Sequence, residues 1–127
     1  METPLRSCCR GIRIGKILIQ RDEQSKKARV YMAKLVKDLE RRWVVVMDPM
    51  LATGGSAIAA IEEVIKQGAK EERIVFVAVL AAPKGLERLH KERPGIVICA
   101  AQVDEGLDEN SYIVPGLGDW GDRYFGT

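Results

Sequence analysis

The sequence predicts an α/β fold with a mostly parallel, open sheet and flanking helices. Apolar runs at 44–47, 74–81 and 96–100 are separated by segments of helical periodicity, an alternation typical of parallel sheets. The run 74–81 is apolar throughout, as expected of a central strand covered on both faces. A length of 127 residues supports a single domain, spanning 1–127.

The first third of the chain predicts a short helix, a strand and an antiparallel arm. Residues 5–10 form the end of a helix that Gly11 closes, and the isoleucine-rich run 12–19 is interpreted as a buried strand. The polar stretch 21–27 turns the chain, so residues 28–35 can pair back as an antiparallel arm. A charged connector then leads to the next strand.

Two helices are predicted between the later strands. From Ser56 onward, apolar positions recur at helical spacing until Gly68, a residue suited to the C′ position of a helix. The charged segment 84–91 predicts a second, shorter helix that carries a solvated His90.

Ligands of an open parallel sheet bind beyond the carboxyl ends of its strands. Arg21, Asp48 and Asp104 each follow an apparent strand, which predicts that they lie near one rim of the sheet. The acidic residues of 104–109 are otherwise interpreted as a solvated loop.

Composition excludes several classes of function. Twenty Lys and Arg against eighteen Asp and Glu leave a net charge of +2, and the basic residues are dispersed, so neither a nucleic-acid nor a membrane partner is expected. Three cysteines without CxxC spacing argue against a disulfide framework or a zinc site and favour a cytoplasmic location. Cys8 and Cys9 are interpreted as packing residues.

The segment 43–57 carries the most informative local pattern, an apolar strand that ends in Asp48 and is followed by a small-residue loop and a helix start. Strand, loop and helix in this order direct backbone N–H groups and the helix dipole at one spot, where a monophosphate can bind. Thr53 and Ser56 add hydroxyl donors, and the glycines of 54–55 let the backbone approach closely. The same pattern also occurs as a plain strand-to-helix turn.

This segment matches neither the phosphate-binding loop of nucleoside triphosphatases nor the nucleophile elbow of hydrolases. A nucleoside-triphosphate loop needs a lysine after its final glycine, and Ser56 follows Gly55 here. A hydrolase elbow needs a glycine two residues after its serine, and that position is Ile58.

Residues 48–57 resemble the ribose-phosphate loop of the type I phosphoribosyltransferases. Pro49 stands where most of that superfamily has a second acid, which is the variant typical of uracil phosphoribosyltransferases. Residues 112–127 resemble the carboxyl-terminal uracil loop of that family, and residues 9–23 resemble its preceding core strand. The resemblance implies a phosphoribosyltransferase-like, Rossmann-like fold. It also implies an enzyme of pyrimidine salvage that transfers the phosphoribosyl group of phosphoribosyl diphosphate to N1 of uracil, giving UMP and diphosphate.

The resemblance further implies roles for individual residues, with Asp48 and Asp119 expected to be catalytic. Ribose 5-phosphate or phosphoribosyl diphosphate is expected to contact Arg21, Asp48, Pro49, Met50, Leu51, Ala52, Thr53, Gly54, Gly55, Ser56 and Asp119. Uracil is expected to contact Ile113, Gly118, Asp119 and Trp120. Mg²⁺ would be bound mainly through the diphosphate, without a directly assigned protein ligand. A homodimer or higher homo-oligomer and GTP as an allosteric effector are also implied.

Family members carry a further stretch, with the diphosphate-binding loop and a hood over the base, before the position of Met1. The sequence is therefore expected to be an amino-terminally truncated, carboxyl-terminal part of the enzyme. The alternative is a catalytically silent nucleotide-binding or regulatory fragment that keeps the phosphate and uracil sites.

Overall fold

Three parallel strands form the centre of the computed structural model, which describes residues 1–22, 25 and 27–127. Strand β5 (Ile74–Ala81) lies between β3 (Val44–Met47) and β6 (Val97–Val103). A fourth, short strand, β4 (Met50–Leu51), pairs with the end of β5 on the same side as β3. The predicted α/β class with a parallel sheet is confirmed, and the apolar run 74–81 coincides with β5.

Helices α2 (Gly55–Lys66) and α3 (Pro83–Glu92) contact each other and pack on the same face of this sheet. Alternate residues of β5 point into the core that they enclose, and Ile74 and Phe76 are fully buried there. Both helices match the predicted segments within two residues. His90 on α3 is exposed, as predicted. In the described part of the chain, no helix combines the length and apolarity that a bilayer span requires.

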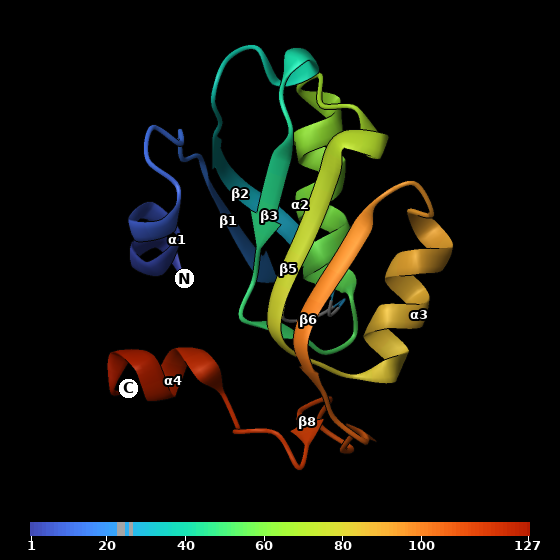
Figure 1. Ribbon diagram of the computed structural model, residues 1–127. Helices are drawn as coiled ribbons and strands as arrows, with labels where there is room; N and C mark the ends of the chain where they lie inside the picture. Colours follow the sequence, from blue (N-terminus) through green and yellow to red (C-terminus); the bar gives the residue numbers. More distant parts are fainter. Residues whose placement is uncertain (23–24, 26) are drawn as a thin grey trace.

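The antiparallel arm is also confirmed, as a hairpin of β1 (Lys16–Arg21) and β2 (Ala28–Lys34) that packs on α2 (Figure 1). The prediction of a buried strand over 12–19 is wrong, because β1 starts at Lys16 and belongs to this separate two-stranded sheet. Ile17 packs against the core, whereas Leu18 on the opposite side of the hairpin is exposed. The turn expected at 21–27 includes residues 23, 24 and 26, which lie outside the described residues.

The termini form short elements around the sheet. Helix α1 (Glu2–Cys8) ends two residues before the predicted end at Arg10, and Cys8 and Cys9 are exposed rather than packed. Single 3-10 turns occur at Leu39–Arg41 and Glu71–Arg73. The carboxyl-terminal stretch forms the antiparallel pair β7 (Gly106–Leu107) and β8 (Ile113–Val114) and then helix α4 (Trp120–Phe125). Figure 1 shows β8 and α4 beyond the carboxyl ends of the parallel strands, at the bottom of the view.

One face of the parallel sheet has no helix over it within the described residues (Figure 1). The expectation that β5 is covered on both faces is therefore wrong for this chain, since both crossover helices pack on the other side. The open face is apolar: Val45 is 46%, Val79 44% and Val97 54% exposed.

We expect this open face to make the chain self-associate, because exposed contiguous apolar surface on a sheet favours association. Val97→Lys should shift the sedimentation of the purified chain toward the monomer. Gln67→Lys, which adds the same charge at the exposed end of α2, should leave self-association unchanged. A wild-type chain that sediments as a monomer at all concentrations would contradict this expectation.

Candidate functional site

A cavity of about 420 Å³ lies at the carboxyl ends of the strands. It is bounded by the end of the arm, by the segment that follows β3 and by two carboxyl-terminal stretches. The lining residues are Arg21, Asp48, 50–57, 110–113 and 118–120. Segments far apart in the sequence therefore meet at the rim predicted from the strand ends.

The segment after β3 is held by backbone hydrogen bonds to β5. Asp48 and Pro49 interrupt the strand, so the Pro49 carbonyl accepts from both Val79 N–H at 3.1 Å and Leu80 N–H at 3.0 Å. Beyond this interruption β4 resumes the pairing, and Leu51 is 1% exposed. The start of the phosphate loop, which we define as residues 48–56, is therefore rigidly placed.

The end of the phosphate loop presents backbone donors. Gly54 precedes α2 with φ of 81°, a left-handed conformation that favours glycine. The first intrahelical bond runs from Ile58 N–H to Gly54 O at 2.9 Å, so the N–H groups of residues 55–57 precede it. Residues 55–57 line the cavity, so the positive end of the α2 dipole faces it.

Helix α3 supports this loop from the side away from the cavity. Ala82 N–H donates to Leu51 O at 2.9 Å where α3 begins. A Cβ at Gly85 would collide with the Ala52 carbonyl oxygen, so only glycine allows this close approach.

Asp48 is a partly buried carboxylate at the cavity wall. Burial raises the pKa of the Asp48 carboxyl above its ordinary value of 3.8, and a hydrogen bond from Met50 N–H opposes this rise. The N–H to Oδ1 distance is 3.3 Å. The other carboxylate oxygen has no hydrogen bond among the described residues, and Asp48 therefore has an acceptor to offer a ligand.

The opposite wall is formed by residues 113–120, which we call the base loop. Ile113 is 3% exposed and packs with Leu80 and Ala82 at the end of β5. Asp104 accepts from Gly116 N–H at 2.8 Å, and its own N–H donates to Ala81 O at 2.9 Å. The base loop is thus tied to the end of the central strand.

The interpretation of 104–109 as a solvated acidic loop is wrong for Asp104, which is partly buried, while Asp108 is exposed but shapes a turn. Asp104 holds the base loop, and Asp108 accepts from the N–H groups of Asn110 and Tyr112 at 2.9 and 2.8 Å. This turn brings residues 110–112 to the cavity wall, and of these the sequence placed only Tyr112 in the stretch that resembles the uracil loop. An Asp followed by Asn two residues later is a turn signal that could have indicated the bend, although not its contact with the cavity.

Asp119 lies at the cavity and also caps α4, where its Oδ1 accepts from Asp122 N–H at 2.8 Å. Trp120 stacks on Tyr124, with ring centroids 4.6 Å apart. Arg123 donates to Leu117 O at 3.0 Å, which fixes the path from the base loop into the helix.

The structure brings the residues of the predicted substrate and uracil sites together, with one difference. Pro49 lies outside the cavity lining, because its carbonyl faces β5. The binding and catalytic roles of the others stay predictions.

The cavity lies between residues 48–56 and residues 113–120, the two stretches that carry the family motifs. The family model of uracil phosphoribosyltransferase matches residues 1–127. The chain belongs to the uracil phosphoribosyltransferase family. The resemblance that the two motifs carry is therefore confirmed for the full length of the sequence.

Individual relatives agree with this family. Uracil phosphoribosyltransferase 1 of Schizosaccharomyces pombe is 58% identical over 127 residues, and the chain covers 58% of its length. Uracil phosphoribosyltransferase of Dictyostelium discoideum is 46% identical over 127 residues, with 59% of its length covered. The chain thus spans less than two thirds of these relatives. The same 127 residues are 46% identical to 26% of the uridine/cytidine kinase UKL1, chloroplastic, of Arabidopsis thaliana.

A solved structure supports the fold. The AQ2163 protein from Aquifex aeolicus superposes with a TM-score of 0.75 at 36% identity, over 87% of this chain and 52% of that chain. The predicted phosphoribosyltransferase-like fold is therefore confirmed.

A metal site built from protein ligands alone does not fit the described residues. They contain no group of three or more His, Cys, Asp or Glu side chains that could hold a metal ion. At the cavity wall the carboxylates are Asp48 and Asp119, and one Asp119 oxygen is engaged in the helix cap.

Asp48→Asn should stabilise the fold at neutral pH. Burial raises the pKa of the Asp48 carboxyl in the folded state, so the wild type loses stability as pH rises from 3.8 through this raised pKa. Above the raised pKa the carboxyl is ionised in both states, and the loss of stability is complete. Asparagine removes this charge and keeps an oxygen for the Met50 N–H. Thermal unfolding of both proteins from pH 3 to 8 should therefore diverge with rising pH. Equal pH profiles would show that the Asp48 carboxylate carries no burial cost.

Proposed function

We propose that this chain carries the ribose 5-phosphate and uracil sites of a uracil phosphoribosyltransferase. The observation that carries the proposal is that Asp48, the N-terminal turn of α2 and the base loop bound one cavity of about 420 Å³. Family membership over residues 1–127 supports it.

In the proposed reaction, N1 of uracil forms a bond to C1 of phosphoribosyl diphosphate while the bond from C1 to the diphosphate oxygen breaks. The N1–H bond of uracil also breaks, and its proton leaves to the departing diphosphate or to water. The developing positive charge on the sugar needs correct alignment of the two reactants rather than covalent help from the protein. The N–H groups of residues 55–57 hold the 5′-phosphate, and the hydroxyls of Thr53 and Ser56 add donors. Asp48 accepts hydrogen bonds from the ribose hydroxyls and so orients C1 toward the base.

The base is proposed to bind against the base loop. Ile113 supplies an apolar wall, and backbone groups at 118–120 pair with the polar edge of uracil. Support comes from the rigid attachment of this loop through Asp104, because fixed donors and acceptors discriminate better than mobile ones.

Mg²⁺ is proposed to be held mainly by the diphosphate of the substrate, where it would neutralise the leaving group. From the family resemblance we also infer a homodimer or higher homo-oligomer, GTP as an effector and a cytoplasmic location.

A transfer assay tests the proposed function directly. The purified chain is incubated with labelled uracil, phosphoribosyl diphosphate and Mg²⁺, and UMP is measured by chromatography. Formation of UMP that depends on Asp48 supports the enzyme. Binding of UMP without any turnover would instead identify a silent binding module.

Gly55→Leu should weaken binding of ribose 5-phosphate by about tenfold or more, because the side chain crowds the N–H groups that hold the phosphate. A Cβ at residue 55 lies 3.7 Å from the nearest side-chain atom, Arg88 Nη1, so the fold should tolerate the substitution. Gly106→Leu is the control, since a Cβ there meets nothing within 4 Å. Calorimetry that gives equal affinity for Gly55→Leu and wild type would remove the phosphate loop from the site.

Uracil should compete with UMP better than cytosine by roughly ten- to a hundredfold, because an unpaired buried polar group costs about 1–3 kcal/mol. Cytosine presents a donor where uracil has the O4 acceptor, so fixed backbone groups cannot pair with both. Competition calorimetry measures the ratio. Equal competition by the two bases would contradict base recognition through the backbone of 118–120.

A further inference from the structure

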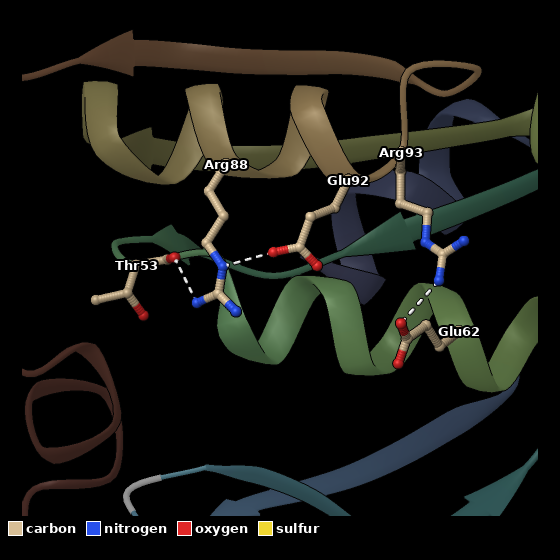
Figure 2. A network of polar contacts seen from close by, with 5 residues as sticks. All are labelled: Thr53, Glu62, Arg88, Glu92 and Arg93. Carbon is tan, nitrogen blue, oxygen red and sulfur yellow. Dashed lines mark hydrogen bonds and ion pairs between the residues drawn. The ribbon is translucent and has the colours of Figure 1, made fainter.

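Arg88 reaches from α3 to the back of the phosphate loop (Figure 2). Its Nη1 donates to the Thr53 carbonyl at 3.4 Å, and its Nε donates to Glu92 Oε1 at 2.9 Å. Arg88 is not among the residues that line the cavity, whereas Thr53 is. The guanidinium therefore contacts the loop from the side opposite a bound ligand.

This contact shows which way the peptide between Thr53 and Gly54 faces. In a planar trans peptide the carbonyl and the N–H point in opposite directions. The Thr53 carbonyl is directed to α3, so the Gly54 N–H is directed away from α3, to the cavity side. That N–H can then join the donors of residues 55–57 on one anion.

The peptide needs such a restraint because glycine permits more than one orientation. Gly54 has φ of 81°, and a residue without Cβ can adopt positive and negative φ with little difference in energy. The ion pair with Glu92 one helical turn away limits the rotamers of Arg88 and holds its guanidinium at the carbonyl. Glu92 and Arg88 lie on the same face of α3, which Gly85 brings against the loop.

We propose that Arg88 is a positioning residue of the phosphate site, which orients the Thr53–Gly54 peptide so that the Gly54 N–H faces the phosphate. This assignment rests on the proposed function for its ligand, although the orientation of the peptide does not. The positive charge of Arg88 also lies near the bound anion and attracts it. Salt screens this attraction, whereas it does not change the orientation of the peptide.

The test uses Arg88→Met, which keeps an unbranched side-chain stem on α3 and removes the guanidinium donors, with Arg41→Met as the matched control. Arg41→Met also removes one positive charge. The Arg41 side chain is 86% exposed, forms an ion pair with Glu40 and does not line the cavity. In the ligand-free chain, the NMR signal of the Thr53 carbonyl carbon should move upfield and the Gly54 amide should become more mobile in Arg88→Met. Neither signal should change in Arg41→Met.

The second measurement is calorimetric titration with ribose 5-phosphate at low and high salt. Arg88→Met should bind about three- to tenfold more weakly than wild type, and the loss should persist when salt screens the charge. A loss that disappears at high salt would overturn the orienting role and leave only an electrostatic one. Unchanged Thr53 and Gly54 signals would overturn the inference whatever the titration gives. Failure of the wild type to bind ribose 5-phosphate, with the NMR changes present, would instead overturn the proposed function.

Discussion

The arrangement of the site depends on the hydrogen bonding of the carboxyl end of β5. This strand end pairs with β4 on one side and with β6 on the other, so both walls of the cavity are attached to it. The Pro49 carbonyl takes two N–H groups of β5, which interrupts β3 and directs the following residues out of the sheet. At the next residue of β5, the Ala81 carbonyl accepts from Asp104 N–H and thereby carries the base loop. Buried backbone groups must be paired, and this requirement fixes the distance between the two loops.

Function at this site conflicts with local stability in two places. The Asp48 carboxylate is partly desolvated, which destabilises the folded state, as the raised pKa of this carboxyl indicates. Gly54 adopts a left-handed conformation where the chain enters α2 and its backbone donors. A glycine at this position loses more conformational entropy on folding than other residues would, which lowers stability. Such departures from the most stable choice are typical of binding sites, where the ligand supplies the missing interactions.

Helix α3 has a second role besides covering the sheet. Its first turn contacts the phosphate loop through Gly85, and Arg88 continues this contact one turn later (Figure 2). Its far end is tied to α2 and to the 3-10 turn before β5, because Arg93 pairs with Glu62 at 2.7 Å and with Glu71 at 3.7 Å. The helix is therefore anchored at both ends, and the loop that it supports shares its rigidity.

The sequence alone determined the parallel strands, the two crossover helices and the phosphate loop, because each rests on local periodicity or on residues close together in the chain. Strand β5 and helix α2 follow directly from their apolar patterns. Only the tertiary structure decided that Asn110 and Ser111 join the cavity and that Asp104 holds the base loop, since these contacts link residues with no shared pattern. It also decided that the end of the apolar run at 12–19 belongs to an arm and that no described helix covers one face of β5. An apolar pattern in a strand indicates that burying that strand is favourable. Which segment buries it depends on how distant parts of the chain pack, and the local pattern does not contain this information.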